Sequence, residues 1–328
     1  MRDTDRPSRP IRDVGVLLLP DFALIAYSCA VEPFRAANII SGRPLYRWRH
    51  VSVDGGPVRA SNGMHLVPEH RVGEPLAPDL LLVCAGGNPT TFADRATFAW
   101  LRQLARAGSI IGGVSGGPYI LARAGLLDGY RCAIHWEHVP TAREAFPRIE
   151  LSDNLFEIDR NRVTCSGGTA PLDLTHALIA REHGRELASD VLDWFIHTNL
   201  RPGDGPQRLP ARERFAVRHP KLVRVLEAME SALEEPLPAE RLAALAGLSV
   251  RQLERLFSSH LHRSIGAHYR ELRLRRARVL LAQSTLSVLE VAVACGFVSA
   301  SHFSRAYRAR FGRPPSTDQS VRVGLRHG

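Results

Sequence analysis

Three side chains in the first half of the chain have the chemistry of a nucleophile, a base and an acid. Ser115 lies in GVSGG (113–117), which matches the pattern G-x-S-x-G. Small residues around the serine permit the strained strand-to-helix turn that exposes a nucleophile at the top of a sheet. His135 and Glu32 add an imidazole and a carboxylate. If the fold brings these groups together, the set can perform acyl transfer by nucleophilic catalysis.

The elements that must position these residues alternate between strand and helix patterns. Apolar runs and alternation predict strands at VGVLLLP (14–20), RWRHVSVD (47–54), LLLVCAGG (80–87) and SIIGGVSGG (109–117). Helical spacing predicts a helix after the first strand, interrupted near Glu32-Pro33, another over 96–108 that Gly108 ends, and a third directly after Ser115. This alternation predicts parallel βαβ units. We expect an α/β domain over residues 13–200 with an open parallel, flavodoxin-like sheet.

The remainder of the chain has a different organisation. The segment around residues 201–220 is rich in proline, glycine and charge, as is typical of a linker, and residues 1–12 are polar, as in a disordered lead-in. After the linker the strand patterns stop. We therefore expect an all-α domain over residues 221–316, followed by a short tail at 317–328.

Charge is unevenly distributed between these parts. The chain carries 43 basic and 33 acidic residues, a net charge of +10. Up to Pro220 there are 26 basic and 24 acidic residues, and from Lys221 onward 17 and 9. The second part thus carries +8, which favours a polyanionic partner. No apolar run is long enough to span a bilayer and no signal peptide is recognisable, so we expect a cytoplasmic protein without membrane contact.

The five scattered cysteines do not form a C-x-x-C pair. This pattern predicts reduced, mostly buried thiols rather than a disulfide framework or a zinc site. We expect no metal site and no cofactor.

The C-terminal part contains an internal repeat. LAALAGLSVRQLERLF (242–257) and VAVACGFVSASHFSRAYRARF (291–311) align with an offset of 49 before the glycine and 50 after it, because the second copy has one extra residue. Each copy combines a short Ala-rich helix, a glycine turn and a helix that a serine caps, Ser249 or Ser299, which is a helix-turn-helix pattern. One copy alone would also suit an ordinary αα-hairpin; two copies joined by an Arg-rich helix favour DNA binding.

Residues 222–315 resemble the AraC/XylS DNA-binding domain, most closely in EVAVACGFVSASHFSRAYRARFGRPPS. The first copy departs from the family at His262-Arg263-Ser264-Ile265, where Gly-x-Ser-Pro is usual, so we expect a locally different turn there. Two recognition helices on one linking helix should enter adjacent major-groove segments about one turn apart.

Exposed positions early in each recognition helix are the expected base readers. They are Val250, Arg251, Gln252 and Arg255 in the first copy, and Ser301, His302 and Arg305 in the second. Other arginines are expected to contact phosphate or only solvent. These are Arg273, Arg275, Arg276, Arg278, Arg308 and Arg310.

The N-terminal part resembles the class I glutamine amidotransferase-like (ThiJ/PfpI) domain. The resemblance rests on LLPDFALIAYSCAVEPFRAAN, LLLVCAGG, GGVSGGPYILARAGLLDG, IHWEH and VTCSGGTAPLDL. In enzymes of that superfamily the elbow residue is a cysteine, whose thiolate is nucleophilic at neutral pH, whereas Ser115 needs a well-placed base. The resemblance implies an inherited pocket used for ligand sensing.

The pocket is expected to consist of Glu32, Gly86, Gly87, Ser115, Gly116, His135 and Trp136. Helix-terminal amides after Ser115 suit a carboxylate, and Glu32 and Trp136 suit a cationic nitrogen, so a zwitterion satisfies both ends. Each residue also has a structural alternative: a cap or ion pair for Glu32, a hydrogen-bonded core position for His135, and packing for Trp136.

Taken together, these patterns predict a transcription regulator, expected to be an activator. Its partners would be promoter DNA, RNA polymerase and a small nitrogen-containing effector such as a betaine, carnitine or amino acid, because the chain looks most like regulators of betaine and carnitine catabolism. A homodimer through the helices over 169–197 is one arrangement, and their packing on the sheet is the other. Two alternatives remain: a Ser115-dependent hydrolase or amidase with a DNA-binding tail, and an α/β domain that only dimerises.

Overall fold

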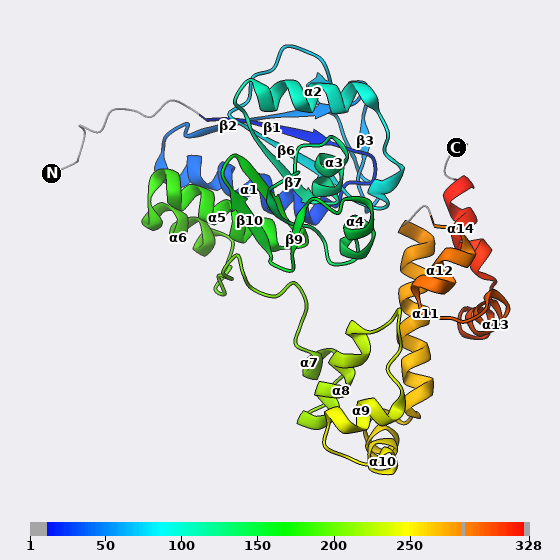
Figure 1. Ribbon diagram of the computed structural model, residues 1–328. Coiled ribbons are helices and arrows are strands. Elements are labelled where there is room, and N and C mark those ends of the chain that lie inside the picture. Colours follow the sequence, from blue (N-terminus) through cyan, green and yellow to red (C-terminus); the bar gives the residue numbers. More distant parts are fainter. Residues whose placement is uncertain (1–11, 284–285, 325–328) are drawn as a thin grey trace. The chain divides into compact units, whose positions relative to one another are not determined.

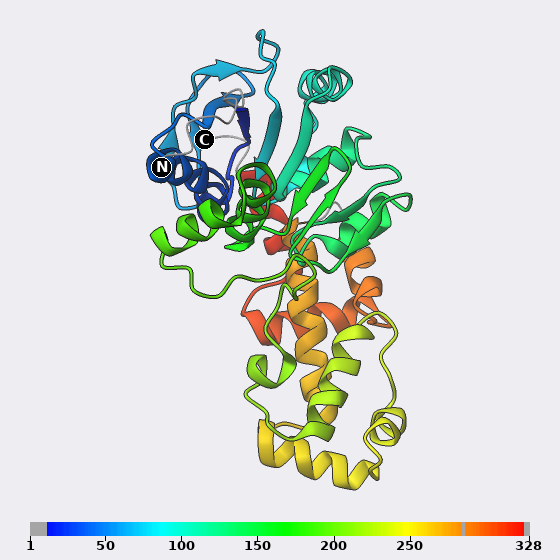
Figure 2. The ribbon, with the colours of Figure 1, turned by 90° about the vertical axis from the view of Figure 1, so that its left-hand side faces the viewer.

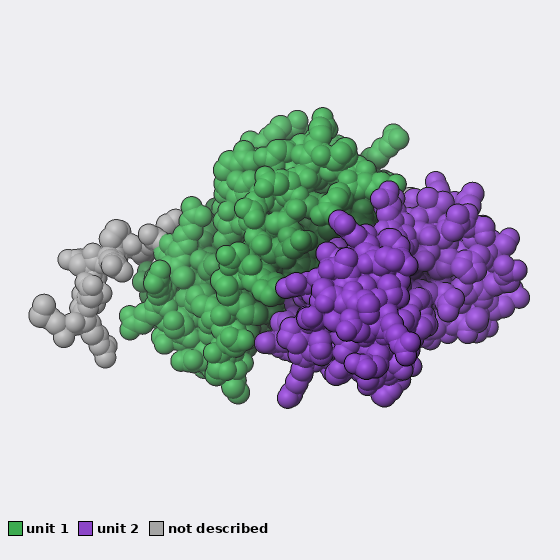
Figure 3. All heavy atoms as spheres, turned by 60° about the horizontal axis from the view of Figure 1, so that its bottom comes forward, with its two compact units in different colours: residues 1–207 green, residues 208–328 purple. Residues whose placement is uncertain are grey.

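The computed structural model describes residues 12–283 and 286–324, and its contacts divide the chain into two compact units (Figure 3). Unit 1 comprises residues 1–207 and unit 2 residues 208–328. The predicted lead-in lies outside the described residues except for Arg12, as do residues 325–328 of the predicted tail. None of the described helices is long and apolar enough to cross a membrane.

A seven-stranded sheet forms the centre of unit 1 as far as the structure describes it (Figure 1). Its order is β10 (Phe156–Asp159), β11 (Arg162–Cys165), β7 (Ile110–Ser115), β6 (Leu80–Ala85), β1 (Arg12–Leu18), β2 (Tyr46–Ser52) and β5 (His70–Arg71). All neighbours pair in parallel except β10 and β11, which form an antiparallel hairpin. The predicted α/β fold is confirmed, with this antiparallel edge as an addition.

Helices cover both faces of the sheet because successive residues of its strands point to opposite sides. Val14, Val16 and Leu18 of β1 belong to the apolar cluster under α1 (Leu24–Ser41), α5 (Ala170–His183) and α6 (Arg185–Trp194). Leu17 and Leu19 belong to the cluster under α2 (Arg95–Arg106) and α3 (Gly117–Arg123). The helices α5 and α1 pack against each other, so α5 is part of the layer over the sheet.

The helix α1 corrects one expectation. It was predicted to be interrupted near Glu32-Pro33, but it continues from Leu24 to Ser41 with Pro33 inside it. Proline removes one backbone donor and usually kinks a helix. Here Pro33 is buried in the apolar face between Ala30 and Phe34, and packing on the sheet keeps the helix intact.

Short elements complete unit 1. They are β3 (Val58–Arg59), β4 (His65–Leu66), the 3-10 turn η1 (Pro89–Thr91), β8 (Arg131–Ala133), α4 (Val139–Ala145) and β9 (Glu150–Ser152). The predicted end of α2 at Gly108 is confirmed: this glycine has a φ of +100°, directly after the C-cap residue Ala107.

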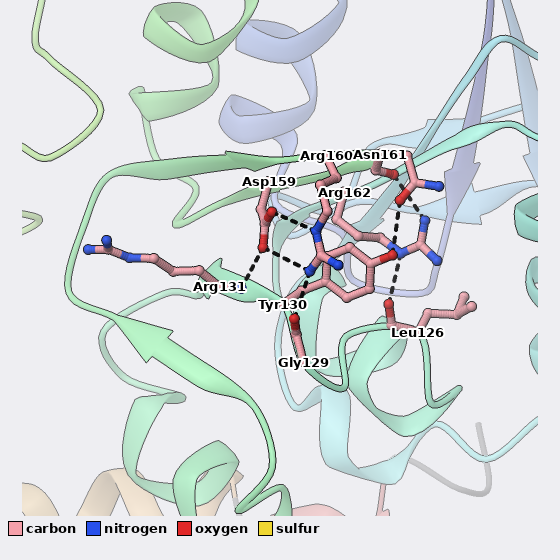
Figure 4. Close-up of polar contacts among 8 residues, drawn as sticks. All are labelled: Leu126, Gly129, Tyr130, Arg131, Asp159, Arg160, Asn161 and Arg162. Carbon is pink, nitrogen blue, oxygen red and sulfur yellow. Dashed lines mark hydrogen bonds and ion pairs between the residues drawn. The ribbon is translucent and has the colours of Figure 1, made fainter.

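A group of polar contacts fixes the amino-terminal end of β11 (Figure 4). The guanidinium carbons of Arg160 and Arg162 lie 3.8 and 4.9 Å from the centroid of the Tyr130 ring. Arg162 Nε donates to the Leu126 carbonyl at 2.8 Å, and the Tyr130 hydroxyl donates to Asn161 Oδ1 at 3.1 Å. The β10–β11 turn is thereby held to the loop after α3, at the end of β11 that pairs with Ile111.

Unit 2 is helical throughout its described residues (Figure 2). Its elements are α7 (Ala211–Arg214), α8 (Pro220–Ser231), α9 (Ala239–Leu245), α10 (Val250–Leu261), α11 (Ile265–Gln283), α12 (Val288–Ala294), α13 (Ala300–Phe311) and α14 (Pro315–Gly324). One apolar cluster joins α8, α9 and α10 to the first half of α11, and a second joins α12 and α13 to its second half. Each helix-turn-helix thus has its own core.

The segment expected to be a linker has defined structure within each unit. Up to Gln207 it lies along unit 1, where the Gly203 carbonyl accepts the Leu155 amide at 2.8 Å. From Arg208 it belongs to unit 2, where α7 forms and Ala211 and Val217 are buried. The proline- and glycine-rich composition of this segment gave no signal for the contacts that it makes within each unit.

Candidate functional site

Ser115 adopts the geometry of a nucleophile elbow. It has a φ of +61° at the end of β7, in the left-handed region that non-glycine residues rarely occupy. A Cβ at Gly113 would stand 2.6 Å from the Pro118 nitrogen, and one at Gly117 would stand 1.9 Å from the Val83 carbonyl oxygen. Only glycine fits at these two positions, so the G-x-S-x-G spacing is explained by steric demands of the turn.

The carboxyl ends of four strands meet around this elbow. A Cβ at Gly167, which follows β11, would lie 2.7 Å from Ser115 Cβ. The loop after β6 approaches the loop after β1 so closely that a Cβ at Gly86 would lie 2.3 Å from the Asp21 carbonyl oxygen. Strand order reverses between β1 and β6, and ligands of open α/β sheets bind outside the carboxyl ends at such a point.

The three groups of the predicted triad are not joined. Glu32 accepts a hydrogen bond from Arg35 Nε at 2.7 Å, one turn along α1. The His135 ring accepts the Glu137 amide at 3.4 Å and lies 3.7 Å from the Glu137 carboxylate. Within the described residues, no hydrogen bond or ion pair links Ser115, His135 and Glu32 to one another. The arrangement therefore lacks the base that would activate the serine.

The backbone after Ser115 does not offer all the donors that the sequence suggested. The Gly116 amide donates to the Ala85 carbonyl at 3.1 Å, so it is occupied by the neighbouring strand end, and Pro118 has no N–H. The expectation that the Gly116 amide receives a ligand carboxylate is corrected by this bond.

The thiols of Cys84 and Cys165 do not offer an alternative nucleophile to Ser115. Cys165 ends β11 and Cys84 lies in β6, both fully buried, and burial raises the pKa of each to about 12. They are therefore protonated at neutral pH, and thiols in this state are poor nucleophiles. Four of the five cysteines are buried, as predicted, and Cys29 is half-buried.

The loop that carries His135 contains a second imidazole that the sequence analysis did not single out. Burial lowers the pKa of His135, and burial followed by the charge of His135 lowers the pKa of His138 to about 4. Both rings are neutral at pH 7, with centroids 5.8 Å apart. Trp136, beside them, is 40% exposed, and its ring centroid lies 5.6 Å from that of His135.

A buried carboxylate also escaped the sequence analysis. Asp173 in α5 accepts hydrogen bonds from Arg201 Nη2 at 2.6 Å and from the Arg201 amide at 2.9 Å, and lies 3.2 Å from His197 Nε2. Further along, the Gln207 side chain donates to the carbonyls of Ile134 and Asn154. These contacts hold the end of unit 1 onto its own helices and onto the loop before His135. A proline-rich composition gave no signal for them.

In unit 2 the repeat is structural as well as sequential. Residues 251–260 and 301–310 share the same order of exposed, intermediate and buried side chains. The Ser249 hydroxyl accepts the Gln252 amide and the Ser299 hydroxyl accepts the His302 amide, each at 3.2 Å. These bonds confirm both predicted N-caps.

The turn after the first recognition helix corrects another expectation. A locally different turn was predicted at His262, yet His262 has a φ of +53° and Gly312, its counterpart, has +74°. In both turns the amide of this residue donates to the carbonyl four residues earlier. Histidine tolerates the left-handed conformation better than most side chains, so the same turn forms without glycine.

Most of the expected base readers are exposed on their recognition helices. The exposed ones are Arg251, Gln252, Arg255, Ser301, His302 and Arg305; Arg308, an expected phosphate contact on the same helix as the last three, is exposed as well. Val250 is half-buried against the first apolar cluster. The side-chain oxygen Oε1 of Gln252 accepts the Ser249 amide at 2.8 Å in a capping box. This bond leaves only the NH2 group of the Gln252 side chain for DNA.

The arginines of the linking helix α11 divide into bonded and unbonded residues. Arg273 donates to the carbonyls of Cys295 and Gly296 and lies 4.2 Å from the centre of the Phe297 ring. It therefore holds the second helix-turn-helix in place, which corrects the expectation of a phosphate or solvent contact. Arg270, which was not among the predicted residues, is exposed and carries no hydrogen bond or ion pair in the described structure.

Comparison with known proteins adds to this geometry. Residues 13–181 match the DJ-1/PfpI family, and residues 242–320 match a helix-turn-helix domain. The chain is 46% identical to the HTH-type transcriptional regulator GbdR of Pseudomonas aeruginosa over 95% of this chain and 85% of that protein. It is 45% identical to the HTH-type transcriptional regulator GlxA of Rhizobium meliloti over 94% and 96% of the two chains.

A solved structure is also similar. The AraC family transcriptional regulator from Pseudomonas putida aligns with a TM-score of 0.50 and 27% identity, over 56% of this chain and 99% of that one. A ThiJ/PfpI family protein from Pseudomonas syringae aligns over 75% of this chain and 94% of that one, with a TM-score of 0.53 and 21% identity, which supports the fold alone.

Proposed function

The chain belongs to the AraC-type transcriptional regulators with an N-terminal DJ-1/PfpI domain, and we propose that unit 1 senses a small nitrogen-containing metabolite and controls DNA binding by unit 2. The observation that carries this proposal is the elbow at Ser115. Its strained turn persists beside the point where ligands of such sheets bind, while no base in the described structure reaches its hydroxyl. This combination suits recognition better than catalysis, so we propose that the chain is not an enzyme.

The proposed ligand site keeps the residues that the sequence indicated, except for the Gly116 amide. Trp136 is 40% exposed, and Glu32 is only loosely engaged, since exposed ion pairs such as Glu32–Arg35 contribute little. Both suit the cationic nitrogen of a betaine, carnitine or amino acid. The Ser115 hydroxyl and the backbone at Gly86 and Gly87 are proposed for the carboxylate, because the Gly116 amide is already bound.

Calorimetric titration of the full chain tests the ligand class. Glycine betaine, carnitine, dimethylglycine and arginine are titrated in turn, and Trp136→Ala should weaken binding of any that binds, because cation–π attraction is lost. Trp194→Ala, another exposed tryptophan in unit 1, is the matched control and should bind normally. If none of the four compounds binds, the zwitterion proposal is wrong.

Ser115→Ala separates sensing from hydrolysis, the alternative function. A regulator should still respond to its effector in a transcription assay, although with altered sensitivity, because the hydroxyl is at most one contact among several. A Ser115-dependent hydrolase or amidase would lose all turnover with this change. Retained transcription together with undetectable hydrolysis of amides and esters by the unaltered chain would support the sensor.

For unit 2 we propose promoter DNA as the partner, with Val250, Arg251, Gln252, Arg255, Ser301, His302, Arg305 and Arg308 at the interface. Activation through RNA polymerase, a cytoplasmic location and a homodimer complete the proposal. Sedimentation of the chain with and without effector tests the dimer.

A further inference from the structure

A hollow lies between the linking helix α11 and the recognition helix α13. Its volume is about 620 Å³. Its floor consists partly of the short side chains of Ala267, Ala306 and Ala309, which leave space between the two helices. Its other lining residues are Arg263, Arg270, Glu271, Leu274, His302, Arg305 and Arg310.

The hollow is strongly positive because Glu271, the one carboxylate among its lining residues, is already paired with two arginines. Glu271 is buried and accepts hydrogen bonds from Arg310 Nε at 2.5 Å and from Arg275 Nε at 2.8 Å. These bonds lower the pKa of Glu271, and the bond from Arg310 has the larger effect. Glu271 is therefore ionised, and its negative charge is balanced by these two arginines. The other cations therefore face the hollow without a carboxylate of their own.

Those cations have no partner within the described structure. Arg263, Arg270 and Arg305 are exposed, and no hydrogen bond or ion pair with another described residue involves them. Three unpaired guanidinium groups around one hollow repel one another, so the arrangement costs stability unless an anion enters. An arginine fork suits phosphate oxygens in particular.

A second hollow of about 530 Å³ continues the first toward the other recognition helix. Arg263 lines both of them, and the second is also lined by Glu254, Arg255, Ser258, His262 and Ser264. The Glu254 carboxylate in it accepts the Ile265 amide at 3.3 Å. The two hollows therefore connect Arg255, an expected base reader of the first helix-turn-helix, with His302 and Arg305, expected readers of the second. We call this surface, defined by Arg255, Arg263, Arg270 and Arg305, the inter-helix band.

We propose that the inter-helix band holds the phosphodiester backbone of DNA where it passes between the two major-groove segments. The proposal rests on the proposed promoter binding and assigns a separate role to Arg263 and Arg270. If recognition helices occupy neighbouring major-groove segments, the backbone between them must cross the surface that joins those helices. Phosphate contacts fix the position of a protein on the duplex but read no sequence. Arg263 and Arg270 thus place the two recognition helices on the duplex, and the readers at the ends of the band supply specificity.

Salt dependence distinguishes this role from base reading. The full chain is used with a duplex that it selects from a random pool, and with a scrambled duplex of the same composition. Arg270→Gln is expected to weaken binding to both by the same factor, and to lower the slope of log K against log salt by about 0.9 for one lost phosphate. Arg270→Lys should keep most of the slope. Arg218→Gln, which removes an exposed, unbonded arginine outside both hollows, is the matched control and should leave slope and affinity unchanged.

Three results would overturn the proposal. Equal losses for Arg270→Gln and Arg218→Gln would mean that only net charge matters, and a loss confined to the selected duplex would make Arg270 a base reader. Stabilisation by inorganic phosphate over chloride at equal ionic strength, absent in Arg270→Gln, would indicate a small-anion site instead. If Arg270→Gln does not fold, Arg263→Gln takes its place under the same expectations. A chain that binds neither duplex would contradict the proposed function itself.

Discussion

Glu32 in unit 1 and Arg270 in unit 2 are both charged and accessible, yet of the two only Glu32 has a hydrogen-bond or ion-pair partner among the described residues. The difference extends to their surroundings. In unit 1, Glu32 is held by Arg35, the Gly116 amide by Ala85, and His135 by its own loop. In the inter-helix band, Arg263, Arg270 and Arg305 are left unbonded by the described residues.

This comparison separates two ways in which a sequence can carry functional side chains. Catalysis needs groups that orient one another, and the nucleophile must reach its base within hydrogen-bonding distance. Binding of a polyanion needs cations that the protein leaves free. Unit 1 has the residue types of a triad without their connections, whereas unit 2 has free cations that no motif at Arg270 announced.

The largest expected effect tests whether the polar groups of unit 1 mainly serve its stability. Asp173→Ala leaves the Arg201 guanidinium without its buried partner and should lower the free energy of unfolding of unit 1 by about 3 kcal/mol, somewhat reduced by the partial exposure of Arg201. Urea unfolding of the full chain measures it. Asp190→Ala, an exposed acid on α6, is the control and should cost less than about 0.5 kcal/mol. If both variants lose a similar free energy of unfolding, the buried Asp173–Arg201 pair stabilises unit 1 no more than an exposed acid does.

Arg305→Ala tests the opposite property in unit 2, where a side chain serves the partner rather than the fold. Loss of a bidentate contact to guanine should weaken binding to the selected duplex by about 10- to 100-fold, since such a contact is worth about 1–3 kcal/mol. The melting temperature should not change, because Arg305 has no partner in the described structure. Unchanged affinity would remove Arg305 from the base readers.

The pH dependence of stability tests the neutral imidazoles of unit 1. His138 has a folded pKa of about 4, below its unfolded value of about 6.5, so the unfolded chain binds the extra proton between these values. This contribution is present above pH 6.5 and is lost as the pH falls toward 4, at a cost of about 2 kcal/mol between pH 7 and pH 5. Urea unfolding of unit 1 at several pH values measures it, and His138→Gln should flatten the curve. An unaltered slope in that variant would assign the dependence to other groups.

The smallest expected effect is a coupling of about 1 kcal/mol between Gly167 and Ser115 at the elbow. Gly167→Ala should destabilise unit 1 by about 1–3 kcal/mol, because the added methyl group meets Ser115 Cβ and the φ of +94° disfavours alanine. Adding Ser115→Gly removes one side of that contact and should recover about 1 kcal/mol in a double-mutant cycle. Strictly additive effects would mean that the two residues do not press on each other.

Much of the fold could be predicted because it depends on local patterns. Buried strands are short apolar runs, and the serine caps of α10 and α13 depend on residues within one turn. The continuation of α1 through Pro33 and the turn at His262 could not be predicted, since packing and a tolerated left-handed conformation overrule the local preference.

The sequence by itself determined the alternation of the α/β domain, the internal repeat, the positive charge of the second part and the elbow around Ser115. Only the tertiary structure decided which polar groups are already bound. It assigned Arg273 to the carbonyls of the second helix-turn-helix and left Arg270 unbonded, although both lie on the same helix. The physical reason is that a hydrogen bond depends on distances of about 3 Å between residues far apart in the chain, which no residue type or spacing encodes.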